Sequence, residues 1–212
     1  MISIQKKFLF VHIPKTGGNS IQEILKEYSE DRILTTNPRQ DGINRFELRN
    51  DRYNIEKHST LAVYKRELEP ELFAELYKFT VIRNPWELMI SLYFSPHRQL
   101  TRWDRKYFIK LLKHTEPLRH YITAPTVWQR IWGRRIPLMS AIDDFIRYEN
   151  LEADFHKICT RIQIPQKPLP LRNKSKRDHY SVYYDDELIE LVRSRFQEEI
   201  DFGGYHFEAM KS

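Results

Sequence analysis

The 212-residue sequence is poor in cysteine, in glycine and in long apolar runs. Cys159 is its only cysteine, which excludes an intramolecular disulfide framework and a cysteine-rich metal site and indicates a reducing compartment. The apolar run near the N-terminus covers only residues 8–11, whereas a membrane-spanning helix needs roughly 18 apolar residues. We therefore expect neither a signal peptide nor a membrane anchor.

Internal repeats and low-complexity tracts are also lacking, and the eleven prolines are scattered instead of forming a linker. The hydrophobic fraction of 41% and the length of 212 residues suit one well-buried core and are short for two. The sequence therefore predicts a single domain over residues 1–212.

Positive charge is concentrated in one segment. Ten of the 35 Lys and Arg residues lie between Phe94 and Met139, against only Asp104 and Glu116. This basic segment contains interleaved aromatic residues and suits an anionic partner, whether polysaccharide, phosphorylated ligand or nucleic acid. An ordinary solvated helix face with its aromatics in the core stays an equally open interpretation. The side chains we consider for an anionic acceptor are Arg102, Trp103, Arg105, Trp128, Arg130, Trp132, Arg134 and Arg135.

Two strand–loop–helix units are predicted along the chain. Residues 7–13 read as a buried strand, and the apolar spacing over residues 21–28 is that of one helix face. Ser20-Ile21-Gln22-Glu23 has the form of a capping box, which places the helix start after Gly17-Gly18. In the second unit, residues 79–82 form a β-branched strand, and Asn84-Pro85 is a favoured helix start.

The remaining segments complete an α/β pattern. Residues 61–77 read as helix interrupted at Pro70, and residues 151–162 and 188–196 each show one apolar helical face. Residues 167–179 read as a basic loop. Strands that alternate with helices predict an α/β, P-loop-like domain with a central parallel β-sheet and helices on both faces.

The loop from Pro14 to Ser20 has the chemistry of an anion site. Adjacent glycines let the backbone bend so that N–H groups and the helix N-terminus surround an anion, and Lys15 adds a point charge. An ordinary βα turn with a solvated lysine is the alternative. The Walker pattern is absent, because the lysine precedes the glycines, and no strand ends in an Asp that would hold magnesium. Phosphoryl transfer without a metal-holding acid is difficult, whereas in sulfuryl transfer the moving group carries less charge, so a metal-free nucleotide site is favoured.

Two segments of the sequence, residues 12–20 and 79–93, resemble motifs of a known enzyme family. Residues 12–20 resemble the 5′-phosphosulfate loop of the sulfotransferases that use 3′-phosphoadenosine-5′-phosphosulfate (PAPS), in the carbohydrate-type branch with the heparan and uronyl 2-O-sulfotransferases. Residues 79–93, with Arg83-Asn84-Pro85-Trp86 and Ser91, resemble that family's 3′-phosphate motif. The resemblance continues through Lys57-His58 and through residues 129–132, 148–151 and 183–185.

The resemblance implies a role for each motif residue, with PAPS as co-substrate and no metal. Lys15 would contact the oxygen that bridges phosphate and sulfate, and Arg83 and Ser91 would bind the 3′-phosphate, since an Arg fork engages two phosphate oxygens. By spacing alone Arg83 would be an ordinary ion-pair residue. The residues that would surround the 5′-phosphate are Thr16, Gly17, Gly18, Asn19 and Ser20.

The sequence signals for the general base and for the C-terminal loop are less specific than those for the two phosphate motifs. His58 is the candidate base, because its ordinary pKa near ~6.5 suits the role; the alternative is that it caps or packs beneath the next helix. We expect His12 to lie within the first strand. Lys174 and Arg177, in a segment similar to the family's C-terminal loop, are possible cofactor contacts or parts of a solvated basic loop.

The resemblance thus implies a sulfotransferase that acts on a hydroxyl acceptor of a carbohydrate, with an anionic glycan as the candidate acceptor. Lumenal members of the family carry an N-terminal anchor, whereas this chain begins at the catalytic strand, so we expect a cytoplasmic enzyme of bacterial type. The alternatives are a nucleotide-dependent phosphotransferase and a non-catalytic polyanion binder; no nucleic acid partner is expected. Acceptor identity and oligomeric state are not encoded in any motif.

Overall fold

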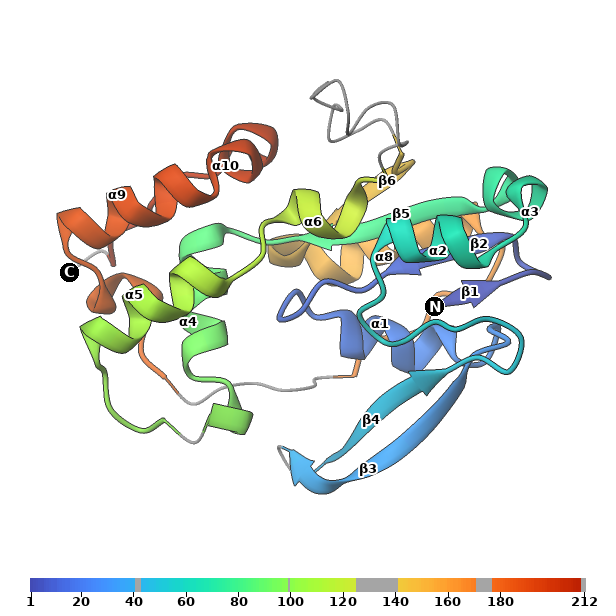
Figure 1. The fold of residues 1–212 in the computed structure, drawn as a ribbon, viewed down its shortest axis with the longest axis horizontal. Helices are drawn as coiled ribbons and strands as arrows, with labels where there is room; N and C mark the ends of the chain where they lie inside the picture. The colour runs from blue at the N-terminus through green and yellow to red at the C-terminus, as the bar shows by residue number, and fades with distance from the viewer. Residues whose placement is uncertain (41–42, 99, 125–140, 171–176, 211–212) are drawn as a thin grey trace.

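A computed structural model describes residues 1–40, 43–98, 100–124, 141–170 and 177–210 (Figure 1). Its strands form a four-stranded sheet in the order β1-β2-β5-β6 and a separate pair, β3-β4. The strands are β1 (Ile2–Ser3), β2 (Phe8–Val11), β3 (Arg32–Gln40), β4 (Ile43–Arg49), β5 (Tyr77–Ile82) and β6 (Asp144–Arg147). The α-helices are α1 (Gly18–Leu25), α2 (Leu61–Glu67), α3 (Pro70–Glu75), α4 (Pro85–Tyr93), α5 (Arg105–His114), α6 (Leu118–Ile122), α8 (Leu151–Arg161), α9 (Asp186–Arg195) and α10 (Gln197–Gly203), with short 3-10 turns at Pro96–Arg98, Tyr148–Asn150 and Tyr180–Tyr183.

The main sheet is mostly parallel. β2 and β6 pair with β5 in parallel, with Phe10 opposite Phe79 and Phe79 opposite Asp144, while β1 pairs with β2 antiparallel. The carboxyl ends of β2, β5 and β6 therefore lie at one edge of the sheet. In α/β folds this edge is where ligands bind.

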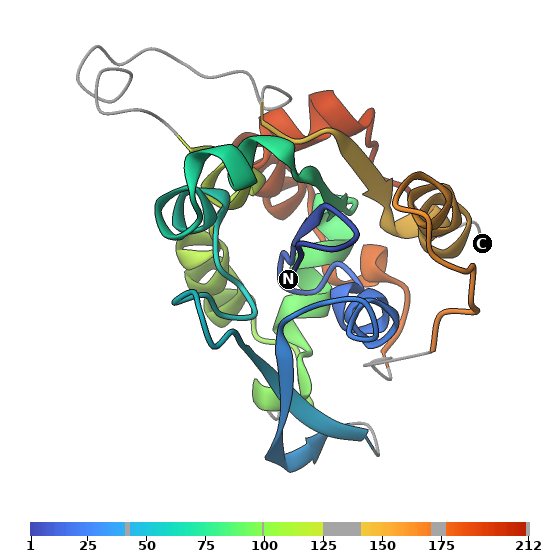
Figure 2. The same cartoon turned by 90° about the vertical axis from the view of Figure 1, so that its right-hand side faces the viewer.

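Helices cover both faces of this sheet, as the sequence predicts. Phe8 and Phe10 belong to the core that includes residues of α1 and α8, whereas Leu9 and Val11 belong to a second core with α2, α4, α5, α6 and α9. Figure 2 shows α1 and α8 on one side and α2 and α6 on the other. Successive side chains of a strand point to opposite faces, so a fully buried strand needs a helix layer on each side.

The capping box predicted at Ser20 is wrong. α1 begins at Gly18, so Ser20 is already inside the helix and its N–H donates to the Gly17 carbonyl at 3.0 Å. Gly17 is the N-cap residue, with φ of 83°, and has no side chain to act as a cap. Glycine adopts this left-handed conformation readily, so the chain turns into the helix earlier than the Ser-x-x-Glu pattern indicates.

Two other predicted boundaries, at Asn84 and at Pro70, agree with the structure. Asn84 is the N-cap of α4 and its side chain accepts from the Trp86 N–H at 3.1 Å, with Pro85 as the first helical residue. The predicted break at Pro70 separates α2 from α3. Tyr77, predicted as the end of a helix, is instead the first residue of β5.

The antiparallel pair β3-β4 was not predicted from the sequence. This antiparallel ribbon extends away from the sheet and its helices (Figures 1 and 2). A usable signal was the Asp41-Gly42 pair between two runs of strand-forming residues, which is a common hairpin sequence; residues 41–42 themselves lie outside the described residues.

Across the described ranges, none of the helices combines the length and the apolar character needed to cross a bilayer. Cys159 is buried in α8, and burial raises its thiol pKa to about 11. The cysteine therefore acts as a small apolar core residue.

Candidate functional site

A cavity with a volume of about 1490 Å³ lies at the carboxyl edge of the main sheet. The segments that follow β2, β5 and β6 all contribute to its lining, and so does the chain from Arg177 to Tyr180. The cavity brings together Lys15, Gly17, Gly18, Asn19, Ser20, His58, Arg83, Ser91 and Arg177. These predicted site residues come from four separate parts of the sequence. Lys174 lies outside the described residues.

The glycine loop is held in a tight, specific conformation. Lys15 and Gly17 both have positive φ, at 66° and 83°, which is uncommon for a residue with a side chain and signals a constrained turn. A Cβ atom at Gly17 would lie 2.8 Å from Leu151, and one at Gly18 would lie 2.1 Å from the His12 ring. The two glycines thus allow the loop to pack directly on its neighbours.

The side chains of the loop divide into two groups. The Thr16 hydroxyl is buried and donates to the Ile13 carbonyl at 2.8 Å, so it holds the turn together, and Thr16 can offer an anion only its backbone N–H. The Asn19 Oδ1 atom is buried without a hydrogen-bond partner among the described residues. The loop leads into the N-terminus of α1, where backbone N–H groups and the helix dipole favour an anion.

Arg83, at the end of β5, connects the two predicted anion motifs. One terminal nitrogen, Nη1, donates to the Lys15 carbonyl and to Ser91 Oγ, the latter at 3.2 Å. The guanidinium carbon lies 3.6 Å from the centre of the Tyr148 ring, a cation–π contact. The side chain is only 5% exposed, and desolvation lowers its pKa. A buried arginine of this kind is a rigid, preoriented donor.

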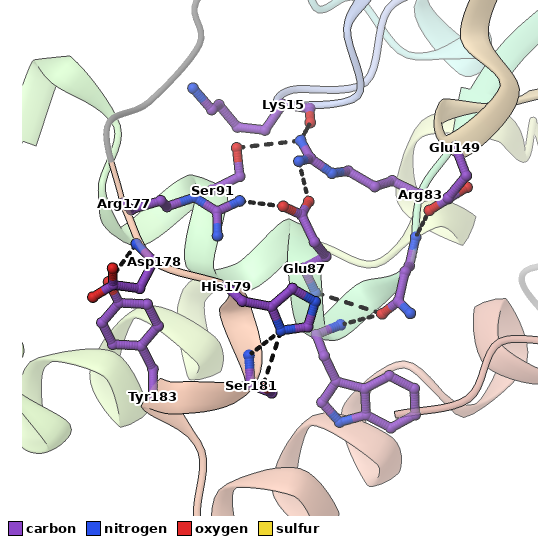
Figure 3. A network of polar contacts seen from close by, with 12 residues as sticks. Lys15, Arg83, Glu87, Ser91, Glu149, Arg177, Asp178, His179, Ser181 and Tyr183 are labelled. Carbon is purple, nitrogen blue, oxygen red and sulfur yellow. Dashed lines mark hydrogen bonds and ion pairs between the residues drawn. The ribbon is translucent and has the colours of Figure 1, made fainter. Parts of the chain in front are cut away.

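Glu87 forms ion pairs with two arginines at once. Its Oε2 atom pairs with Arg83 and its Oε1 atom pairs with Arg177 (Figure 3). Glu87 lies on α4, four residues after Arg83, and Arg177 comes from the distant C-terminal part of the chain. No role was predicted for Glu87 from the sequence. The i, i+4 spacing from Arg83 was the available signal.

The residues that follow β6 contact Arg83 and the neighbouring Asn84. Tyr148 stacks on Arg83, and Glu149 accepts from the backbone N–H of Asn84 at 2.9 Å and from the Tyr205 hydroxyl at 3.3 Å. Tyr148 and Glu149 lie in the resemblance to the family, but no role was predicted for them. Only the parallel pairing of β6 with β5 places them beside Arg83.

His58 lies against His12 beside the glycine loop. Its Nδ1 atom is 3.0 Å from the His12 backbone oxygen, and the two ring centres are 4.5 Å apart. A carbonyl oxygen can only accept, so Nδ1 must carry the proton of this hydrogen bond. In the neutral ring the basic lone pair is then on Nε2. Thr60, not His58, caps α2, so the alternative in which His58 caps the next helix is wrong.

His12 directly follows β2 instead of lying within it, and it lines the cavity. The side chain is buried beneath Gly18. Burial lowers the pKa of His12 well below its ordinary value, and the charges of His58 and Lys57 lower it further. His12 is therefore a neutral packing residue of the site and a poor proton acceptor.

In the described part of the basic segment the aromatic residues pack among the helices, whereas Arg102, Lys106, Lys110 and Lys113 are exposed. Trp103 packs against Tyr93 and Phe108 with ring centres 4.8 and 5.0 Å apart. Arg105 pairs with Asp185 at 3.0 Å and also with Glu187. Arg98 does line the cavity, where it is held by the Leu92 carbonyl and the Tyr107 hydroxyl. Trp128, Arg130, Trp132, Arg134 and Arg135 lie outside the described residues.

Within the part of the chain that the structure describes, no three His, Cys, Asp or Glu side chains are grouped in a way that could hold a metal ion. The cavity lining combines basic side chains and the backbone of the glycine loop with several carboxylates, among them Glu47, Glu87 and Glu149.

Comparisons with known proteins identify the family. A family model described as the sulfotransferase family matches residues 1–206. A search of curated proteins found no match, and a search of solved structures found none. The matched region contains the glycine loop, His58, Arg83, Glu87, Ser91 and Arg177 and spans nearly the whole chain. The protein therefore belongs to the sulfotransferase family, whose chemistry is the transfer of a sulfuryl group.

Proposed function

We propose that this sulfotransferase takes the sulfuryl group from PAPS and transfers it to a hydroxyl group of a carbohydrate. The observation that carries the proposal is the hydrogen bond from Arg83 to the Lys15 carbonyl. This bond joins the motif that resembles a 5′-phosphosulfate loop to the motif that resembles a 3′-phosphate site. Both motifs face one cavity, as a nucleotide with phosphate groups at both positions requires.

The chemistry of the lining fits the two charged ends of PAPS. The phosphosulfate end suits the glycine loop, where Lys15 and the N-terminus of α1 supply positive potential. The 3′-phosphate suits Arg83, Ser91 and Arg177. In support, Arg83 Nε is buried without a hydrogen-bond partner among the described residues, and such a donor is costly unless a ligand or water satisfies it.

The transfer step is a displacement at sulfur. His58 Nε2 takes the proton of the acceptor hydroxyl, and the acceptor oxygen forms a bond to sulfur. The bond from sulfur to the bridging oxygen breaks, and its electron pair stays on the 5′-phosphate. The leaving group is adenosine 3′,5′-bisphosphate (PAP). Lys15 stabilises the negative charge that develops on this phosphate, which is where a preoriented cation is most effective.

We further propose an anionic glycan as the acceptor. Arg98 belongs to the basic segment and lines the same cavity as His58, so a carboxylate or an existing sulfate of the acceptor has a cationic partner there. A cytoplasmic location is part of the proposal and rests on the single buried cysteine.

The proposed donor is tested by the melting temperature of the protein with PAP, with ATP and without nucleotide. A ligand that binds only the folded state raises the melting temperature by mass action, so we expect PAP to raise it more than ATP does. Transfer of labelled sulfate from PAPS to a panel of oligosaccharides then reports activity. If ATP stabilises the protein and PAP does not, the donor assignment is wrong.

The role of Lys15 is separated from binding by the variant Lys15→Ala. Because Lys15 is proposed to act on charge that develops in the transition state, we expect kcat to fall by about 100-fold or more. The affinity for PAP should change much less. Labelled-sulfate transfer and calorimetry with PAP measure the two quantities. An unchanged kcat would remove Lys15 from the mechanism.

A further inference from the structure

Glu87 occupies the position between two guanidinium groups where an anion would bind. Arg83 and Arg177 are both almost fully buried, with 5% and 8% of their side chains exposed, and Glu87 is 25% exposed and lines the cavity. Figure 3 shows the carboxylate between the two arginines. A carboxylate with one oxygen on each arginine imitates the contact that a phosphate makes with two arginines.

The donors of Arg83 leave little room for both anions. Nη1 is already used by the Lys15 carbonyl and Ser91 Oγ. The donors that remain are Nε, which has no partner among the described residues, and Nη2, which is paired with Glu87. A phosphate that binds the Nε and Nη2 edge with two oxygens therefore places its negative charge next to the Glu87 carboxylate, which is ion-paired with the same Nη2.

Charge adds to this steric competition. Two anionic groups that share one guanidinium repel each other, and the repulsion is strong where the surroundings are buried. Conversely, two buried arginines without a counter-charge are costly, because burial of an unpaired charge is expensive. One negative partner at a time is the favourable arrangement.

We propose that Glu87 is an internal competitor of the ligand's 3′-phosphate: its carboxylate neutralises Arg83 and Arg177, and a phosphate binds these arginines only by displacing it. The identity of the natural ligand rests on the proposed function; the competition itself does not. The 3′-phosphate is common to PAPS and PAP, so its binding energy does not distinguish substrate from product. Glu87 lowers that shared affinity and so favours release of PAP after transfer.

The test compares the parent protein with Glu87→Gln, using inorganic phosphate, PAP and adenosine 5′-phosphate as probes. The glutamine keeps the size of the side chain and removes its charge. We expect Glu87→Gln to bind inorganic phosphate and PAP about tenfold more tightly, equivalent to ~1.4 kcal/mol of relieved competition. Adenosine 5′-phosphate, which lacks the 3′-phosphate, should bind with unchanged affinity. Calorimetry measures all three.

A matched control is Glu75→Gln. Glu75 forms an exposed ion pair with Lys7 and does not line the cavity, so this variant makes the same change in net charge without touching the site. We expect its affinity for all three probes to equal that of the parent. Equal gains in both variants would mean that net charge, not Glu87, controls the affinity, and would overturn the proposal.

Weaker binding of inorganic phosphate to Glu87→Gln, or unchanged binding, also overturns the proposal, because Glu87 would then orient the arginines or only support the fold. If Glu87→Gln does not fold in chloride buffer, phosphate should restore a cooperative melting transition, and sodium chloride at the same ionic strength should not. Failure of phosphate to restore folding counts against the proposal. Failure of the proposed function is a separate result: the parent would then bind adenosine 5′-phosphate as tightly as PAP.

Discussion

At the scale of single residues, the contact between His12 and Gly18 couples the end of β2 to the anion loop. The backbone of Gly18 lies so close to the His12 ring that a Cβ atom would be 2.1 Å from it. The ring is buried, and its Nδ1 atom has no hydrogen-bond partner among the described residues. A histidine that is neutral, buried and poorly satisfied makes the stability of the site depend on pH.

We predict that replacing His12 removes part of the acid sensitivity of the fold. In the unfolded chain His12 takes up a proton near its ordinary pKa of 6.5, whereas in the folded protein burial lowers this pKa well below that value. The unfolded state therefore binds more protons below pH 6.5, and the free energy of unfolding falls as the pH is lowered, by up to about 1.4 kcal/mol per pH unit.

The measurement is urea unfolding of the parent and of His12→Asn between pH 7 and pH 5. We expect a shallower decrease of the free energy of unfolding in the variant, which has no ionisable group at this position. The slope is the informative quantity, since the substitution also changes packing beneath Gly18. Identical slopes in the two proteins would show that His12 takes up its proton equally in both states.

At the scale of elements, helix α4 contributes several residues of the site, and its N-terminus is fixed by a side-chain cap. Asn84 caps the helix through its Oδ1 atom, and its Nδ2 atom donates to the His206 carbonyl at 3.1 Å. The same helix positions Glu87 and Ser91 one and two turns further on. The geometry of the arginine cluster therefore depends on where this helix begins.

We predict that Asn84→Ala destabilises the protein by about 2 kcal/mol, because it removes an N-cap and a further buried hydrogen bond. Asp104→Ala is the matched comparison, since Asp104 caps α5 through one bond to the Tyr107 N–H at 3.0 Å. Its loss should cost about 1 kcal/mol. Urea unfolding of both variants decides the order, and a smaller loss for Asn84→Ala than for Asp104→Ala would contradict the role given to Asn84.

At the scale of the whole molecule, the uneven distribution of basic residues bears on which acceptor the enzyme prefers. The basic segment carries ten of the 35 basic residues. In its described part Trp103 serves the core and Arg105 pairs with α9 and its N-cap, while Arg98 faces the cavity. Within the described residues, the basic segment thus contributes Arg98 to the lining of the same cavity as the candidate base.

We predict that an oligosaccharide with uronate or sulfate groups is used with a higher kcat/KM than its neutral counterpart at low ionic strength. The preference should shrink as salt is added, because exposed charges are screened within about 10 Å at 0.1 M salt. Labelled-sulfate transfer at two salt concentrations measures it. Equal use of the neutral acceptor at low salt would assign the basic segment to the fold or to another partner.

Several local features could be predicted from the sequence because they depend on residues close to one another in the chain. The strand at residues 79–82, the cap at Asn84, the break at Pro70 and the turn at Gly17-Gly18 all follow from backbone preferences over a few residues. The family resemblance, now supported by the match over residues 1–206, added the candidate roles of Lys15, Arg83 and Ser91.

Only the tertiary structure decided which distant residues meet. Arg177 pairs with Glu87 across 90 positions of sequence, and Tyr148 reaches Arg83 because β6 lies parallel to β5. No spacing rule encodes such contacts, since sheet order and helix placement set them. The sequence by itself determined the local shape and charge of each motif, because these depend on neighbouring residues. The fold determined that Arg177 joins Arg83 at the Glu87 carboxylate, because only packing of the whole chain brings the C-terminal segment beside α4.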